Sequence, residues 1–197
     1  MEEFDRLVEI GDILHGPNGC PWDKKQTFES LRPHTLEEVH ELLEAVDEDS
    51  TVGMVEELGD VLFQIIFYAK LGEKSDRFTL KDVIEKIIEK LIRRHPHVFG
   101  DTEVKDADEV LHHWELIKAE EKKERKHPLE GIPKTLGALL RAQKVVSKMI
   151  RKGIPFPEKT VSIGDQLLDL VIQAQEEGVD AESALRTALK RYEEAFD

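Results

Sequence analysis

VEELGDVLFQIIFYA, residues 55–69, is the stretch of sequence that decides the fold of this chain. Apolar side chains surround almost the whole circumference of the helix that it predicts, and a helix of this kind is buried. Its polar exceptions recur at helical spacing and form one narrow strip: Glu57, Asp60, Gln64 and Tyr68. Because a buried carboxylate is unfavourable unless it is paired or bound to a metal, we expect a cation opposite Glu57 and Asp60.

The preceding helix is predicted from TLEEVHELLEAV, residues 35–46. Glu37, Glu38 and Glu41 lie within about 100° of arc on this helix, opposite an apolar face. Taken alone, these glutamates fit a solvated acidic face as well as a site. Thr35 and Glu38 have the spacing of a capping box, which predicts that the helix begins at Thr35.

Two helices joined by a short connection pack as antiparallel neighbours. This pairing would bring the carboxylates of both stretches to one place. Hard oxygen ligands without cysteine suit Mg²⁺ or Mn²⁺, and Mg²⁺ is commonly held by carboxylates together with substrate phosphates. The pattern therefore predicts a divalent cation site that takes a phosphorylated ligand.

The composition limits the class of protein. The 197 residues are 40% hydrophobic, enough for a core, and the net charge of −14 argues against a general nucleic-acid binder, whose affinity comes from basic patches. The single cysteine, Cys20, excludes a disulfide framework and fits a reducing cytoplasm. No apolar run approaches the ~20 residues that cross a membrane, and the acidic start MEEFD is not a signal peptide. We expect a cytoplasmic protein that binds neither membrane nor nucleic acid.

The rest of the chain also predicts helices, so the expected fold is an all-α helical bundle. Prolines and a glycine between residues 127 and 134 predict a boundary that separates domains 1–126 and 127–197. In the second domain IGDQLLDLVIQA (163–174) resembles LGDVLFQIIFYA (58–69), with Ser162 in place of Glu57. We interpret it as a degenerate second repeat without a metal site, which provides packing or dimer surface.

Cations on apolar helix faces strengthen the prediction of a phosphate ligand. Arg94 continues the apolar row of its helix, Lys90 lies at the edge of that face, and Lys118 falls on the apolar surface near Trp114. Phosphate oxygens pair well with an arginine fork. The alternatives are ion pairs with the acidic helices for the cations and core packing for the tryptophan.

Three stretches resemble the signatures of the MazG nucleoside triphosphate pyrophosphohydrolases: GCPWDKKQTFESLRPHTLEEVHELLEA, EELGDVLFQIIFYA and EKLIRRHPHVFGD. The resemblance includes the EExxE…ExxD pattern and runs from about residue 1 to about residue 120. It implies an all-α, Mg²⁺-dependent, usually dimeric enzyme that cleaves NTPs between the α- and β-phosphates to give NMP and pyrophosphate. The degenerate second repeat departs from family members with two complete repeats.

The resemblance also implies roles for residues. By motif position the metal ligands would be Glu38, Glu41, Glu57 and Asp60, and Glu37 would lie beside them. Glu37 or Glu41 would orient or deprotonate the attacking water. The positions that contact the nucleotide in the family are Lys90, Arg93, Arg94 and Trp114, and we add Lys118 from its place on the helix face.

Two other readings of the sequence stay open. Glu37 with His40 and Glu109 with His112 have the i, i+3 spacing of ferritin-like di-iron sites. A helical regulatory module that holds a nucleotide or a protein partner without turnover is the non-catalytic alternative.

Overall fold

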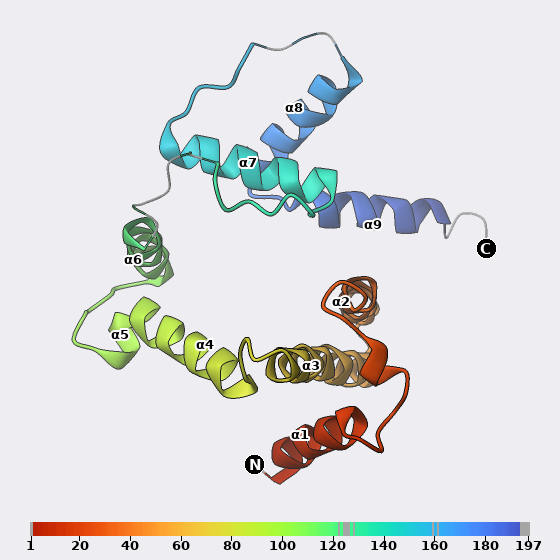
Figure 1. The fold of residues 1–197 in the computed structure, drawn as a ribbon. Coiled ribbons are helices and arrows are strands. Elements are labelled where there is room, and N and C mark those ends of the chain that lie inside the picture. The colour runs from red at the N-terminus through yellow and green to blue at the C-terminus, as the bar shows by residue number, and fades with distance from the viewer. Residues whose placement is uncertain are drawn as a thin grey trace. The chain divides into compact units, whose positions relative to one another are not determined.

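The computed structural model describes residues 2–121, 123, 127, 129–158, 160 and 162–193. The described residues form helices and no strand, which confirms the all-α prediction (Figure 1). The chain divides into two compact units, Met1–Glu115 and Leu116–Asp197. Lys126, at the predicted boundary, lies outside the described residues, so that boundary stays a prediction.

The first unit contains most of the helices. They are α1 (Glu2–His15), the 3-10 helix η1 (Asp23–Lys25), α2 (Arg32–Asp47), α3 (Thr51–Lys74), α4 (Leu80–Arg94) and α5 (Pro96–Phe99). Helix α6 (Ala107–Glu120) continues from this unit into the second, which also contains α7 (Ala138–Lys152), α8 (Ile163–Glu176) and α9 (Ala181–Glu193).

Helices α2 and α3 form the predicted antiparallel pair and lie side by side in Figure 1. The connection is short, and the Ser50 side chain caps α3 by accepting a hydrogen bond from the Gly53 amide at 3.2 Å. Contacts between Thr35 and Tyr68 at one end, and between Ala45 and Gly53 at the other, establish the antiparallel direction. A Cβ atom on Gly53 would lie 3.1 Å from the Cβ of Ala45, so the helices approach closely there.

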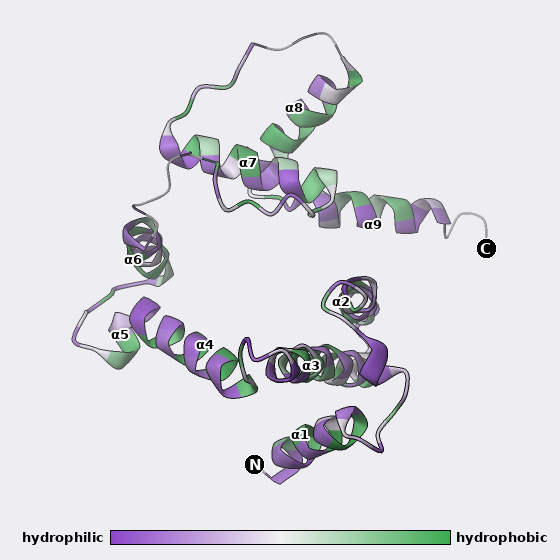
Figure 2. Cartoon of the chain, viewed as in Figure 1, coloured by the Kyte–Doolittle hydropathy of each residue, from purple (hydrophilic) through white to green (hydrophobic). Residues whose placement is uncertain are grey.

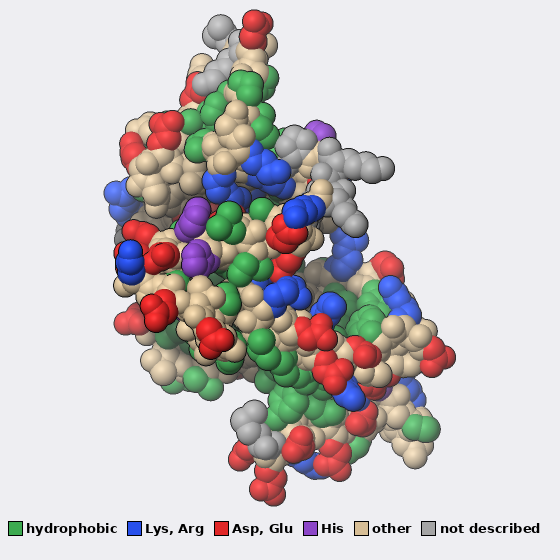
Figure 3. All heavy atoms as spheres, turned by 90° about the vertical axis from the view of Figure 1, so that its left-hand side faces the viewer, with side chains coloured by type: hydrophobic (Ala, Val, Ile, Leu, Met, Phe, Trp, Pro, Cys, Tyr) green, Lys and Arg blue, Asp and Glu red, His purple; other side chains and the backbone are tan. Residues whose placement is uncertain are grey.

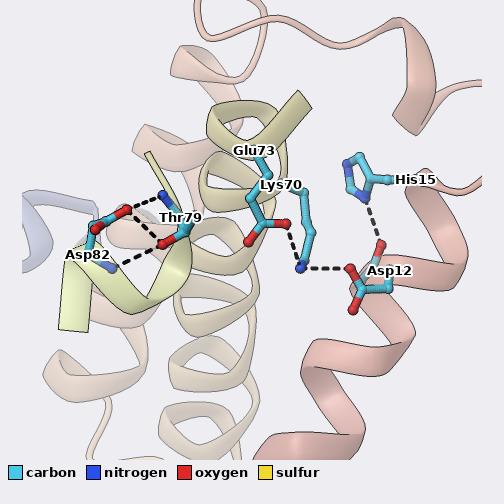
Figure 4. Close-up of polar contacts among 7 residues, drawn as sticks. Asp12, His15, Lys70, Glu73, Thr79 and Asp82 are labelled. Carbon is cyan, nitrogen blue, oxygen red and sulfur yellow. Dashed lines mark hydrogen bonds and ion pairs between the residues drawn. The ribbon is translucent and has the colours of Figure 1, made fainter. Parts of the chain in front are cut away.

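Helix α2 begins earlier than the capping-box spacing predicts. It starts at Arg32 with Pro33 in its first turn, and no side chain caps it. Proline is suited to the first turn of a helix because its φ angle is preset and its missing N–H is not needed there. Thr35 is therefore inside the helix, where its hydroxyl donates to the Leu31 carbonyl at 3.0 Å. The predicted cap is wrong, and a capping box occurs instead at α4, between Thr79 and Asp82 (Figure 4).

Helix α3 is buried only over its C-terminal half. Ile66 and Phe67 belong to two core clusters, which also contain Leu31, Ala69, Leu71 and Leu80. In the N-terminal half Val55 is 69% exposed and Leu58 is 55% exposed. The prediction that the whole helix is buried is wrong for this half of the single chain, because α2 packs on only one side of it. Hydrophobic side chains reach the surface in the lower half of Figure 3.

A buried lysine links α1 to α3. Lys70 Nζ lies 2.7 Å from an oxygen of Asp12 and 2.9 Å from an oxygen of Glu73 (Figure 4). Burial lowers the pKa of Lys70, but the hydrogen bonds to the two carboxylates outweigh this effect and leave the pKa raised. The close contact of Gly11 with Ile66 keeps α1 near this ion pair.

The second unit has its own small core of Val146, Val171 and Ala181. Helix α7 is strongly amphipathic, with green and purple sides in Figure 2. Its Gln143 side chain donates to the Val179 carbonyl and accepts from the Ala181 amide, which fixes the start of α9. Within the described part of the chain, none of the helices has the length and apolar character needed to cross a bilayer.

Candidate active site on the α2–α3 pair

Three carboxylates from the two paired helices converge. Glu38 and Glu41 lie on successive turns of one face of α2, and Glu57 projects from the second turn of α3. One oxygen atom from each lies within 4.8 Å of the others. Oxygen donors this close to one another form a donor set of the kind that hard divalent cations prefer.

Asp60 stands one turn beyond Glu57 and acts on the same group through its charge. Partial burial raises the pKa of Glu38, and the charges of Asp60 and Glu41 raise it further. The Gln64 amide opposes this by a hydrogen bond to Glu38. Removal from water and the charges of Glu41 and Asp60 likewise raise the pKa of Glu57. The four acids therefore repel one another.

The surroundings differ from the sequence expectation in two respects. Glu41 and Asp60 are exposed, and Glu38 and Glu57 are only partly buried, so the site opens to water in the single chain. No side chain of the described residues forms an ion pair with these four acids. Among the described residues, the cation expected opposite Glu57 and Asp60 is therefore not a lysine, arginine or histidine side chain. A cation from solution would relieve the repulsion.

Glu37 belongs to a different group of side chains. Its carboxylate lies 3.7 Å from His34 Nδ1, and the His34 ring meets the edge of Trp22 with ring centres 5.5 Å apart. Sequence reasoning missed this arrangement. A usable signal was present, since His34 precedes Glu37 by three residues and such pairs are neighbours on a helix surface.

The predicted cationic and aromatic contacts lie on other elements. Lys90 lines an open groove together with Phe78 and Asp82, and the lining of that groove includes none of the four acids. Arg93 and Arg94 occupy the last turn of α4, and Trp114 lies in α6. Lys118 belongs to the second unit.

The structure gives no support to the di-iron reading. Among the described residues, the one group of three or more potential ligands is Glu38, Glu41 and Glu57. Neither the Glu37–His40 pair nor the Glu109–His112 pair belongs to it.

A family model and several related proteins all assign this chain to the same family. The family model of the MazG nucleotide pyrophosphohydrolase domain matches residues 26–99, which include all of α2, α3 and α4. A nucleoside triphosphate pyrophosphohydrolase of Escherichia coli K12 is 37% identical over an alignment that covers 100% of this chain and 86% of that protein. YabN of Bacillus subtilis is 52% identical over 73% of this chain, but the aligned part is only 29% of YabN.

A solved structure agrees with these matches. The mazG-related protein from Thermotoga maritima has a TM-score of 0.51 and 28% sequence identity, and the match covers 58% of this chain and 97% of that protein. The E. coli relative exceeds 30% identity and is covered over most of its length. The chain therefore belongs to the MazG nucleotide pyrophosphohydrolase family.

Proposed function

We propose that this protein hydrolyses nucleoside triphosphates to nucleoside monophosphates and pyrophosphate at the α2–α3 pair. The observation that carries the proposal is the convergence of Glu38, Glu41 and Glu57 without a cationic side chain paired to any of them among the described residues. The printed activity of the E. coli relative, a nucleoside triphosphate pyrophosphohydrolase, supports it. The substrates are canonical or non-canonical NTPs and dNTPs.

The donor set fits Mg²⁺, with Mn²⁺ as a substitute, because all of its members are carboxylates. We assign Glu38, Glu41, Glu57 and Asp60 as the ligands. When bound, Mg²⁺ supplies charge neutralisation at phosphate oxygens and lowers the pKa of water. Glu41 and Glu37 are the candidates for orienting the attacking water at the α-phosphate and accepting its proton.

Cations and an aromatic side chain complete the proposed substrate site. We assign contacts with the phosphates to the cations and a contact with the base to the tryptophan: Lys90, Arg93, Arg94 and Trp114. Lys118 lies in the second unit, and its role stays a prediction from the sequence. Arginine and lysine neutralise the charge that develops on a leaving pyrophosphate, and the indole ring offers a stacking face.

We also propose that the enzyme is a homodimer. Helix α3 carries four exposed apolar residues at helical spacing, Val55, Leu58, Leu62 and Ile65. An apolar stripe of this kind is expected to pack against another surface, and a second copy would present the same stripe. The net charge of −14 and the single cysteine fit a cytoplasmic enzyme that binds no nucleic acid.

The second unit is proposed to be a degenerate repeat of the first, with a domain boundary near residue 126. In the matched stretches Ile66 and Val171 correspond, and both are almost fully buried. Likewise Leu62 and Leu167 correspond, and both are exposed. The alignment with the E. coli relative spans 227 positions, more than the 197 residues here, so that relative has residues that this chain lacks.

A panel of NTPs and dNTPs incubated with Mg²⁺ tests the activity. Pyrophosphate as the sole inorganic product is the expected result, and Glu38→Gln is expected to abolish its release. Orthophosphate release would instead identify a γ-phosphatase. Nucleotide binding without any turnover would favour the non-catalytic regulatory module.

A further inference from the structure

Gln64 is the one neutral side chain recorded in hydrogen-bond contact with the acidic group among the described residues. It lies on α3 one turn after Asp60, and its Nε2 atom is 3.5 Å from Oε1 of Glu38 on the facing helix. At its other end, Oε1 is 3.4 Å from the hydroxyl oxygen of Thr35. The amide thus bridges one residue of the acidic group and one residue a turn earlier on α2.

The hydrogen-bonding partners fix which way the amide faces. The Glu38 carboxylate only accepts hydrogen bonds, so the Gln64 NH₂ group faces it and Oε1 faces the Thr35 hydroxyl. The single hydrogen of that hydroxyl is shared between the Leu31 carbonyl at 3.0 Å and Gln64 Oε1 at 3.4 Å. The flipped amide would place its own oxygen against a carboxylate oxygen, and two acceptors repel each other. The Thr35 oxygen is also 3.2 Å from the Tyr68 hydroxyl, which can donate to it.

The far end of this chain of contacts is anchored in the core. Tyr68 stacks on Phe28, with ring centres 6.1 Å apart and planes 20° apart. The guanidinium carbon of Arg77 lies 4.5 Å from the centre of the same Phe28 ring. Leu31, whose carbonyl accepts from Thr35, is 1% exposed. The position of Gln64 is therefore set by packed side chains rather than by solvent.

A neutral donor is suited to this position. Like charges within 4.8 Å push the Glu38 carboxylate away from Glu41 and Glu57 and toward water. A lysine or arginine at position 64 would hold Glu38 in place but would compete with a metal ion for its charge. An amide holds one oxygen of Glu38 and leaves the negative charge available.

We propose that Gln64 is a positioning residue that holds Glu38 in the metal-binding arrangement, and that the Thr35 hydroxyl supports the other end of its amide. The proposal rests on the proposed function, because it requires Glu38 to be a metal ligand. Gln64 touches neither substrate nor metal in this scheme and acts only through Glu38. The two contacts at 3.4 and 3.5 Å are long, so their effect is moderate.

The test measures Mn²⁺ binding to the full chain by electron paramagnetic resonance, without nucleotide. Gln64→Leu is expected to weaken binding about tenfold, at the low end of what loss of a ligand's supporting contact costs, and Thr35→Val about threefold. Thr35→Ser keeps the hydroxyl and is expected to bind as the wild type does. The matched control is Gln173→Leu, which removes another glutamine–glutamate hydrogen bond. In it Gln173 of α8 donates to Glu177, the residue that directly follows this helix.

Kinetics separate positioning from general damage. Gln64→Leu is expected to raise the Mn²⁺ concentration for half-maximal rate while kcat at saturating Mn²⁺ stays within about threefold. Wild-type Mn²⁺ affinity in Gln64→Leu would overturn the proposal, and so would a Thr35→Ser variant as weak as Thr35→Val. If Gln64→Leu does not fold, the two Thr35 variants decide the question. Mn²⁺ binding that is lost in Glu38→Gln but unchanged in Gln64→Leu would refute the positioning role alone, whereas no binding by the wild type would overturn the proposed function as well.

Discussion

Replacement of Lys70 by methionine tests the ion pair that joins α1 to α3. The Lys70 side chain is only 8% exposed, and methionine keeps most of its packing against Gly11 and the core. The substitution removes the cation and leaves Asp12 and Glu73 without it. The expected result is a lower free energy of unfolding of the first unit.

The exposure of the two remaining carboxylates determines the magnitude. Breaking a buried ion pair destabilises a protein by about 3–5 kcal/mol when the remaining charge stays buried. Here Asp12 is 58% exposed and Glu73 is 35% exposed, so water can solvate both after the lysine is lost. We therefore expect a smaller loss, about 1–3 kcal/mol.

The pH dependence has a definite sign. Because the pKa of Lys70 is raised above 10.5 in the folded chain, its contribution is fully present below that value and is lost as the pH rises through the raised pKa. The difference between the wild type and Lys70→Met is thus expected to be constant between about pH 6 and 9 and to shrink in stronger alkali.

Tryptophan fluorescence in urea is the assay, because both tryptophans, Trp22 and Trp114, lie in the first unit. Lys81→Met is the matched control, since Lys81 is 79% exposed and forms only a surface pair with Glu85. This control is expected to lose no more than about 0.5 kcal/mol. A loss for Lys70→Met no larger than that of the control would refute the reasoning.

Three further predictions concern the site and the assembly. Glu41→Gln and Asp60→Asn are each expected to lower turnover by about a hundredfold or more, since each removes a proposed metal ligand, while the protein still unfolds cooperatively by fluorescence; full activity in either variant would contradict the assignment. Because the pKa values of Glu38 and Glu57 are raised above 4.5, Mn²⁺ affinity is expected to fall on acidification before an ordinary glutamate would titrate. A resonance titration that stays flat down to pH 4.5 would exclude this competition. Leu62→Lys places a charge on the exposed α3 stripe and is expected to give a monomer by light scattering; an unchanged dimer would show that the interface lies elsewhere.

The helical period and one short connection were enough to predict that carboxylates of the two helices converge. Glu38 and Glu41 recur on one face of α2, and Glu57 follows a three-residue connection, so an antiparallel pair brings all three together. These relations are local in sequence. For the same reason the all-helical fold followed from periodicity alone.

Features that depend on distant residues were not predictable. In the sequence Lys70 is a single charged residue in an apolar helix. Its ion pair with Asp12 could not be predicted, because the two residues are far apart in the sequence. The start of α2 depends on Pro33 and the packing of the preceding loop, which outweighed the capping-box spacing at Thr35. The exposure of Val55 depends on which helices cover α3, and composition does not state that.

The contact between Ala45 and Gly53 determines how far apart the two helices hold the carboxylates of the proposed metal site. Glu41 lies four residues before Ala45 and Glu57 four residues after Gly53, so both carboxylates stand one turn from the place where the backbones nearly touch. A methyl group on Gly53 would press against the Ala45 side chain, push the two helices apart and increase the distance between the Glu41 and Glu57 carboxylates. Mg²⁺ requires oxygens at about 2.1 Å and Ca²⁺ accepts about 2.3–2.6 Å. Gly53→Ala should therefore shift ion preference from Mg²⁺ toward Ca²⁺ with every proposed ligand retained. An unaltered Mg²⁺/Ca²⁺ affinity ratio would show that flexible side chains, and not the helix spacing, determine which ion size the site prefers.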